Sequence, residues 1–265
     1  MNRAYGWVKD KQDHRDLKCK LSGKSDFPPM VDLRNEFKFP DVYDQGHLGS
    51  CTAQAIGFVY QYDEIFQHNT CCFMPSRLFI YYNERSLEGT INEDSGASIR
   101  DGIKTINSIG VCEEKLHPYE IEKFTTRPSK VCYDEAAKCK ALEYSRVDQD
   151  LNSIKEILNS KRPIVFGFRV YESFESHEVA KSGIMPQPNV KKERLLGGHA
   201  VVCVGYDDEK KTFIIRNSWG AGWGDNGYFH MPYSVLCDTE MSADLWVVKK
   251  VSDPVLKSWN YCCIC

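Results

Sequence analysis

The sequence predicts an α+β fold in which a mainly helical half precedes a mainly β-stranded half. Apolar residues recur at helical spacing within residues 45–140, and short apolar runs broken by Gly, Pro and Asp follow in the second half. Helices first and strands second are typical of an α+β arrangement, with room for a cleft between the halves. The 265 residues suffice for one large domain or two modest ones around such a cleft.

The helical half begins at Ser50, which is a good N-cap for a helix over 51–69. Four apolar residues of that stretch fall on one helical face: Ala55, Val59, Tyr62 and Phe66. A second helix is predicted over 75–89, with Pro75 near its start and Gly89 past its end. Further helices are predicted over 95–110 and 150–161.

The β half is predicted from short runs rich in Val, Ile, Phe and Tyr, spaced as in an antiparallel sheet or barrel. The predicted strands lie within 161–171, 198–208, 211–219, 227–234 and 245–251.

The ends differ from the centre in composition. Residues 1–27 are polar and charged and end in SDFPPM, which predicts an extended arm. One domain is expected over 28–250, with 41–140 mainly helical and 141–250 mainly β, followed by a Cys-rich tail over 251–265. The sequence YCCIC in that tail leaves lipidation open.

Composition excludes several classes of protein. The net charge is −3 and no basic block occurs, so a nucleic-acid partner is not expected. The first residues lack the apolar stretch of a signal peptide, and no window is apolar enough for a membrane span. We therefore expect a monomer in the cytoplasm, another intracellular space or a virion, with its twelve cysteines in a reducing compartment. Their spacing is unlike that of zinc ligands, so neither a metal nor a cofactor is expected.

One cysteine lies in a distinctive place, in the stretch DQGHLGSCTAQAIG over 44–57. Cys51 is predicted at a helix N-terminus, where partial positive charge and unpaired N–H groups favour thiolate over thiol. By itself this position leaves four roles open: a buried apolar residue, half of a disulfide, a metal ligand or a nucleophile.

Three other residues favour the nucleophile. His199 follows two glycines at the start of a predicted strand, and Asn217 ends another. An imidazole that serves a thiolate needs a third group to fix its tautomer, and a side-chain amide can do this without adding charge. Gln45 precedes Cys51 in a loop, where its amide and the Cys51 N–H could form an oxyanion hole.

At these residues the chain resembles the papain-like cysteine peptidases, which include the cathepsins. The stretches QGHLGSC, GGHAVVCVGY and RNSWGAGWGDNGY are similar to the three signature blocks of that family, in the same order. GWVKDKQDHRD and DSGASIRDG are similar to a short-armed microbial and viral branch, which points to a giant-virus cathepsin-like protease. The resemblance implies a papain-like fold, with a helical left subdomain and a barrel-like right subdomain flanking the cleft.

The resemblance also implies roles for individual residues. Cys51 would be the nucleophile, His199 the acid and base, Asn217 its orienting group and Gln45 the oxyanion donor. The residues implied to bind substrate are Ser95, Gly96, Gly198, Trp219, Trp223, Ser242 and Asp244. Trp219 would cover the His199–Asn217 bond, Trp223 would line the primed side, and either Ser242 or Asp244 would form the base of the S2 pocket, Asp244 favouring a basic P2 residue.

The chain also departs from the family pattern. Leu48 stands where the family has a disulfide cysteine and Thr52 where it has Trp, and the partners of Cys132 and Cys237 near Tyr82 and Glu193 are missing. No His-His pair of the carboxydipeptidase type occurs, so an endopeptidase acting on proteins or peptides is expected. The arm is expected either to inhibit, as in a zymogen, or to brace the fold. Alternatives are a catalytically silent peptide-binding protein and a Cys-His acyltransferase.

Overall fold

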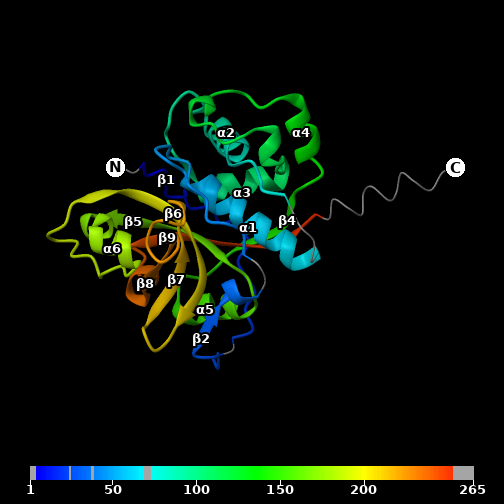
Figure 1. The fold of residues 1–265 in the computed structure, drawn as a ribbon. Coiled ribbons are helices and arrows are strands. Elements are labelled where there is room, and N and C mark those ends of the chain that lie inside the picture. The colour runs from blue at the N-terminus through cyan, green and yellow to red at the C-terminus, as the bar shows by residue number, and fades with distance from the viewer. Residues whose placement is uncertain (1–3, 24, 37–38, 69–72, 253–265) are drawn as a thin grey trace.

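Helix α1 (Cys51–His68) lies between a helical lobe and a sheet lobe, as Figure 1 shows. The figure presents the computed structural model, which describes residues 4–23, 25–36, 39–68 and 73–252. Residues 51–64 of α1 are all buried, because α1 packs against α2 and α3 on one side and against β6 and β9 on the other. The α+β fold class predicted from the sequence is confirmed.

The helical lobe contains the helices predicted from apolar spacing. Ser76 caps the second helix by accepting a hydrogen bond from the N–H of Phe79, and Gly89 ends it in the left-handed conformation (φ 78°). Ser98 caps the third helix in the same way. The helices after α1 in this lobe are α2 (Arg77–Glu88), α3 (Ile99–Ser108) and α4 (Lys130–Ala136).

The sheet lobe is built on a seven-stranded sheet in the order β4-β9-β5-β6-β7-β8, with β2 pairing β6 and every pair antiparallel. Its strands are β2 (Met30–Asp32), β4 (Ala141–Arg146), β5 (Ile164–Tyr171), β6 (Leu195–Asp207), β7 (Thr212–Arg216), β8 (Tyr228–Pro232) and β9 (Ser242–Val251). Three helices lie in the same half: α5 (Leu151–Asn159), α6 (His177–Ser182) and α7 (Tyr233–Leu236). The sequence patterns predicted β5 to β9 but missed β2 and β4, whose apolar alternation is short.

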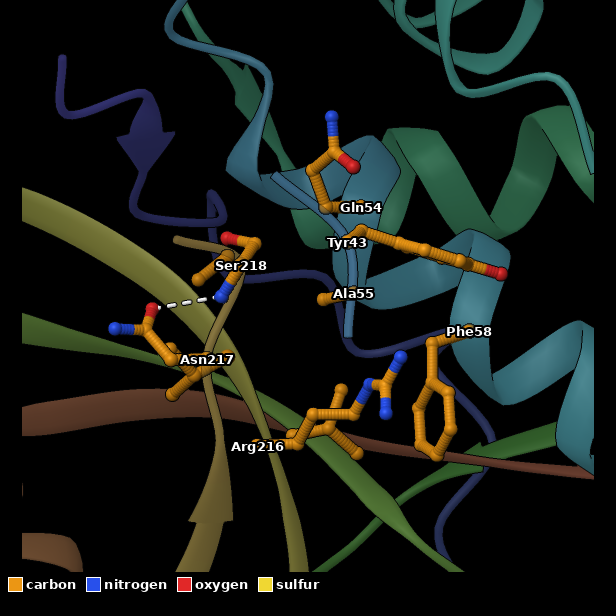
Figure 2. A pocket seen from close by; sticks show the side chains of 10 residues that line it. Tyr43, Gln54, Ala55, Phe58, Arg216, Asn217 and Ser218 are labelled. Carbon is orange, nitrogen blue, oxygen red and sulfur yellow. Dashed lines mark hydrogen bonds between the residues drawn. The ribbon is translucent and has the colours of Figure 1, made fainter. Parts of the chain in front are cut away.

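Arg216 at the end of β7 joins the two lobes. The residue is 3% exposed, its guanidinium lies 4.1 Å from the Phe58 ring of α1, and its Nη1 donates to Pro40 O at 2.8 Å. Figure 2 shows the Arg216 guanidinium beside the Phe58 ring, with Asn217 and Ser218 on the other side of Arg216. Because the next residue is Asn217, this buried cation also fixes the end of β7 that enters the site.

The N-terminal segment lies between the lobes (Figure 1), and residues 4–23 are called the arm below. Its strand β1 (Trp7–Val8) pairs in parallel with β3 (Ala97–Ser98), and Lys18 forms a bridge with Arg146 of β4. Short 3-10 helices occur at Leu33–Asn35, Glu114–Leu116, Ile121–Lys123 and Glu172–Glu175. Across the described residues, none of the helices is both long and apolar enough for a membrane span.

Candidate active site

Cys51 is the first residue of α1 and is fully buried. The backbone N–H of Ala200 in β6 donates to its Sγ at 3.3 Å, so the residue after His199 touches the sulfur. Ser50 does precede the helix as predicted, but its hydroxyl pairs with Tyr119 at 2.5 Å and accepts from the Gln54 side chain at 3.1 Å. Helix α1 therefore presents a thiol directly to the strand that carries His199.

His199 and Asn217 form the pair expected from the sequence. His199 Nε2 and Asn217 Oδ1 are 2.8 Å apart, and both residues are buried. Because Nε2 contacts Asn217, Nδ1 is the ring atom left to exchange a proton with a thiol. Figure 2 shows the Ser218 N–H donating to the same Asn217 oxygen, at 2.8 Å, which fixes the orientation of the amide.

Trp219 covers this pair. Its ring stacks on His199 with centroids 5.0 Å apart and an interplanar angle of 25°, and Trp223 meets Trp219 edge-on at 4.9 Å. Both indoles are less than a tenth exposed. Exclusion of water by such rings strengthens the hydrogen bond that they cover.

Gln45 is fully buried beside the start of α1. Its Oε1 accepts from Ser218 Oγ at 2.7 Å, so the Nε2 donor must point the other way. Nε2 donates to Leu48 O at 2.9 Å and to Ala4 O, in the arm, at 3.1 Å. A carbonyl oxygen of the arm therefore occupies the position where Gln45 would hold an oxyanion.

The arm passes close to Cys51. Burial raises the pKa of the Cys51 thiol to about 11, although the backbone N–H groups of Ala200, Gly6 and Thr52 near the sulfur act against that rise. Tyr5 contacts the rings of His199 and Trp219 edge-on, with centroids 6.0 and 6.3 Å away. With the arm in place, Cys51 is a buried thiol whose pKa lies above its ordinary value.

Glycines make this close approach possible. A Cβ on Gly6 would lie 1.7 Å from Gly49 O, and one on Gly96, whose φ is 69°, would lie 2.1 Å from Gly6 O. A Cβ on Gly198 would lie 2.6 Å from Trp7 O, and one on Gly167 would lie 2.0 Å from the Trp7 indole. Gly96 and Gly198 were predicted from the sequence, whereas Gly6 and Gly167 were not.

The two S2 candidates take different positions. Asp244, in the left-handed conformation (φ 60°), accepts from Trp7 Nε1 at 3.1 Å and from the Asp10 N–H at 2.8 Å. Ser242 Oγ donates to Val235 O at 2.9 Å. Asp244 is thus the candidate that contacts a side chain lying in the cleft.

Ser95, the remaining predicted substrate residue, donates to Thr90 Oγ1 at 2.8 Å and lies at the surface next to Gly96.

The arm is anchored by carboxylates. Asp10 Oδ2 contacts Arg146 Nη2 at 2.7 Å and Trp246 Nε1 at 2.9 Å, while Asp16 pairs with Arg100 at 2.5 Å and with Arg146 at 2.6 Å. Arm residues missed at the sequence level are thus part of the site. The stretch GWVKDKQDHRD indicated a family branch, but its spaced aspartates resemble those of an ordinary solvated segment.

The seven cysteines that the structure describes are free thiols, and within the described ranges no three His, Cys, Asp or Glu side chains form a group suited to a metal ion. Cys132 shares a buried cluster with Cys112 instead of a family-type disulfide partner. The YCCIC tail and the Cys71-Cys72 pair lie outside the described residues.

Comparison with known proteins decides the family. The family model for papain family cysteine proteases matches residues 27–246, most of the chain. This chain belongs to the papain family of cysteine proteases. It is thus a cysteine peptidase with a papain-like fold, and proteins or peptides are its substrates.

Two relatives match the papain-family chain along nearly its whole length. An uncharacterised peptidase C1-like protein of Acanthamoeba polyphaga mimivirus is 44% identical over 98% of this chain and 91% of its own length. The crystal structure of xylellain, a cysteine protease from Xylella fastidiosa, is 43% identical with a TM-score of 0.87 and covers 94% of this chain and 98% of its own. Procathepsin B from Trypanosoma congolense, at 18% identity and a TM-score of 0.75 over 92% of this chain and 85% of its own, shares the fold.

Proposed function

We propose that the chain is a cysteine endopeptidase that acts through Cys51 and His199 and that stays latent while its arm lies in the cleft. The observation that carries this proposal is that the residue after His199 contacts the Cys51 sulfur while His199 itself pairs with Asn217. Arm residues lie against the same groups, Ala4 at the Gln45 donor and Gly6 near the sulfur. The assignment of catalytic roles rests on this geometry together with family membership.

The chemistry is acyl transfer to water. With the cleft open, water replaces the arm around Cys51, and the start of α1 together with His199 imidazolium favours the thiolate. The thiolate attacks the carbonyl carbon of a peptide, and Gln45 Nε2 and the Cys51 N–H bind the resulting oxyanion. His199 then protonates the leaving amine and later takes a proton from the water that hydrolyses the thioester. Asn217 holds the imidazole in the tautomer that these steps need.

The arm engages two of the groups that these steps need. Ala4 O accepts from the proposed oxyanion donor, Gln45 Nε2, and the N–H of Gly6 lies near the Cys51 sulfur. Burial at the same time disfavours the thiolate. This arrangement supports an inhibitory arm over one that only braces the fold.

The S2 pocket is proposed to bind hydrogen-bond donors through Asp244. With the arm seated, that carboxylate accepts from the Trp7 indole and from a backbone N–H, while Arg146 lies 3.5 Å away. A P2 lysine or arginine would replace the two arm donors, in keeping with a preference for basic residues.

The test is peptide hydrolysis by the Gly6→Ala chain, in which the arm is expected to be released, with and without Cys51→Ala, using a fluorogenic peptide library and a thiol-directed epoxide. Cys51→Ala should lose all hydrolysis and labelling while its melting temperature stays within a few degrees of the parent's. Substantial residual hydrolysis would remove Cys51 from the role of nucleophile. Adding a primary amine distinguishes hydrolysis from acyl transfer, because a transferase would form the amide product.

A further inference from the structure

Gly49, two residues before Cys51, is held by a carboxylate from another part of the chain. Its N–H contacts both oxygens of Asp94 at 3.0 Å. A Cβ on Gly49 would lie 3.0 Å from Asp94 Oδ1, so the carboxylate is seated tightly on that glycine. Leu48 precedes Gly49 and Glu93 precedes Asp94, and neither is a cysteine. These two loops are therefore linked here by hydrogen bonds and not by a disulfide.

The link continues to the strand that pairs with the arm. Tyr81 of α2 donates its hydroxyl to Asp94 Oδ1 at 2.5 Å and accepts the N–H of Gly96 at 3.1 Å. Gly49, Asp94, Tyr81 and Gly96 thus form one chain of hydrogen bonds, called the Asp94 clasp below.

Both ends of the Asp94 clasp lie next to Gly6 of the arm. At one end, the arm residue Gly6 fits against Gly49 O, and Leu48 O, next to Gly49, accepts from Gln45 Nε2. At the other end, Ala97 N, next to Gly96, donates to Gly6 O at 2.8 Å. The clasp therefore spans the loop that carries the nucleophile and the backbone edge that pairs with an extended chain.

Tyr81, in the middle of the clasp, is held by burial and by contacts with Arg85. Tyr81 is fully buried, and burial together with its bond to Asp94 raises the pKa of the Tyr81 phenol, which stays a donor. The guanidinium of Arg85 lies 4.1 Å from the Tyr81 ring and donates to Ile91 O at 2.5 Å and to Glu93 O at 3.1 Å. Arg85 thereby fixes the backbone that leads into Asp94.

We propose that Asp94 is a positioning residue for peptide hydrolysis, which sets the loop of Gly49 and Cys51 in register with the substrate-pairing edge at Gly96. This inference rests on the proposed roles of Cys51 and Gly96. Asp94 acts on the nucleophile side through Gly49, and on the substrate side through Tyr81. Loss of the Tyr81 hydroxyl should therefore affect substrate binding alone, whereas loss of the Asp94 carboxylate should affect both binding and turnover.

The experiment compares Asp94→Ala, Asp94→Asn and Tyr81→Phe in the full chain, each with and without Gly6→Ala to separate effects on the seating of the arm. Asp94→Ala should lower kcat about tenfold, equivalent to about 1.4 kcal/mol, and raise KM, because the Gly49 N–H loses its hydrogen bonds to a charged group. Asp94→Asn keeps one oxygen for the Gly49 N–H, so its kcat should stay within about threefold of the parent. Tyr81→Phe should raise KM at nearly unchanged kcat.

Glu93→Ala is the matched control, because that exposed side chain adjoins Asp94 and lies outside the clasp. It should leave kcat and KM unchanged. The proposal would be overturned if Asp94→Ala kept the parental kcat and KM. It would also be overturned if Tyr81→Phe lowered kcat about tenfold, as expected for Asp94→Ala, and this second comparison remains informative if Asp94→Ala does not fold. An active Cys51→Ala protein would instead refute the proposed function, so the two failures are distinguishable.

Discussion

The carbonyl oxygen of Ala4 accepts a hydrogen bond from Gln45 Nε2 at 3.1 Å. In an open cleft that donor would face the oxyanion of a tetrahedral intermediate. Gly6 at the same time lies near the Cys51 sulfur. On the proposed mechanism, the arm would therefore compete with substrate for the Gln45 donor and for the Cys51 thiol. The predictions below test this competition and the charges around it.

Gly6→Ala should release the arm and raise activity. A Cβ at that position would lie 1.7 Å from Gly49 O, a backbone atom that cannot swing aside. We expect the second-order rate constant for epoxide labelling of Cys51 to rise about tenfold or more, equivalent to about 1.4 kcal/mol of lost arm seating. Lys11→Ala, an exposed arm position, is the control and should label at the parental rate. An unchanged rate in Gly6→Ala would mean that the arm does not limit access.

The released enzyme should show a bell-shaped dependence of kcat/KM on pH. Rate should rise as the thiolate forms and fall as His199 loses its proton, because both partners of the ion pair are needed. The measurement is kcat/KM of the Gly6→Ala chain between pH 4 and pH 10. A single ionisation near about pH 8.5, the ordinary pKa of a free thiol, would contradict the ion pair.

Asp10 should make seating of the arm weaker as pH rises. Burial and the charge of Asp244 raise the pKa of Asp10 to about 6, from an ordinary value of 3.8, although Trp246, Arg100 and Arg146 act against that rise. The seated arm thus holds this proton more tightly than the free arm does, so its seating is strongest below pH 3.8 and weakens until about pH 6.

Epoxide labelling of the parent, corrected for the intrinsic pH dependence of the Gly6→Ala chain, measures this effect. Protection should fall between pH 4 and pH 6 in the parent. Asp10→Asn, which resembles the protonated carboxyl, should stay protected across that range. Burial acts to raise the pKa of Asp16, but hydrogen bonds from Arg100 and Arg146 outweigh it and lower that pKa. Protonation of Asp16 should therefore affect arm seating only at more acidic pH. Equal protection of the parent at pH 4 and pH 6 would show that Asp10 does not control the seating of the arm.

Glu84 should make folding less favourable at alkaline pH. The residue is fully buried between α1, α2 and α3, accepts from Thr52 Oγ1 at 2.8 Å, and burial raises its pKa to about 8 from 4.5. The folded chain therefore binds this proton more tightly than the unfolded chain, and the free energy of unfolding falls as pH rises from 4.5 to about 8.

Glu84→Gln removes this ionisation and should therefore be more stable than the parent at pH 8, by a few kcal/mol at most, with a smaller gain at pH 5. Urea denaturation at the two pH values measures the difference. Glu93→Gln, an exposed carboxyl, should show no such pH-dependent gain. The reverse order of stabilities would show that Glu84 is ionised in the fold.

Local patterns predicted much of this protein. Helical spacing predicted α1, and Pro75 near the start and Gly89 past the end predicted the extent of α2, because terminal signals and apolar faces are properties of neighbouring residues. The candidate catalytic set was accessible for a different reason: thiol chemistry requires a few residue types in recognisable surroundings, and Cys51, His199, Asn217 and Gln45 occur in them.

Contacts between distant segments were not accessible in this way. The sequence alone determined an α+β papain-family peptidase and the order of its halves, and it predicted Cys51 as the nucleophile. Only the tertiary structure decided that the arm fills the cleft, that Asp244 meets Trp7 and that Asp94 holds Gly49. These pairs are 237 and 45 residues apart in the chain, so no local period or propensity records them. They exist because packing of the two lobes on α1 brings glycine backbones and buried charges within hydrogen-bonding distance.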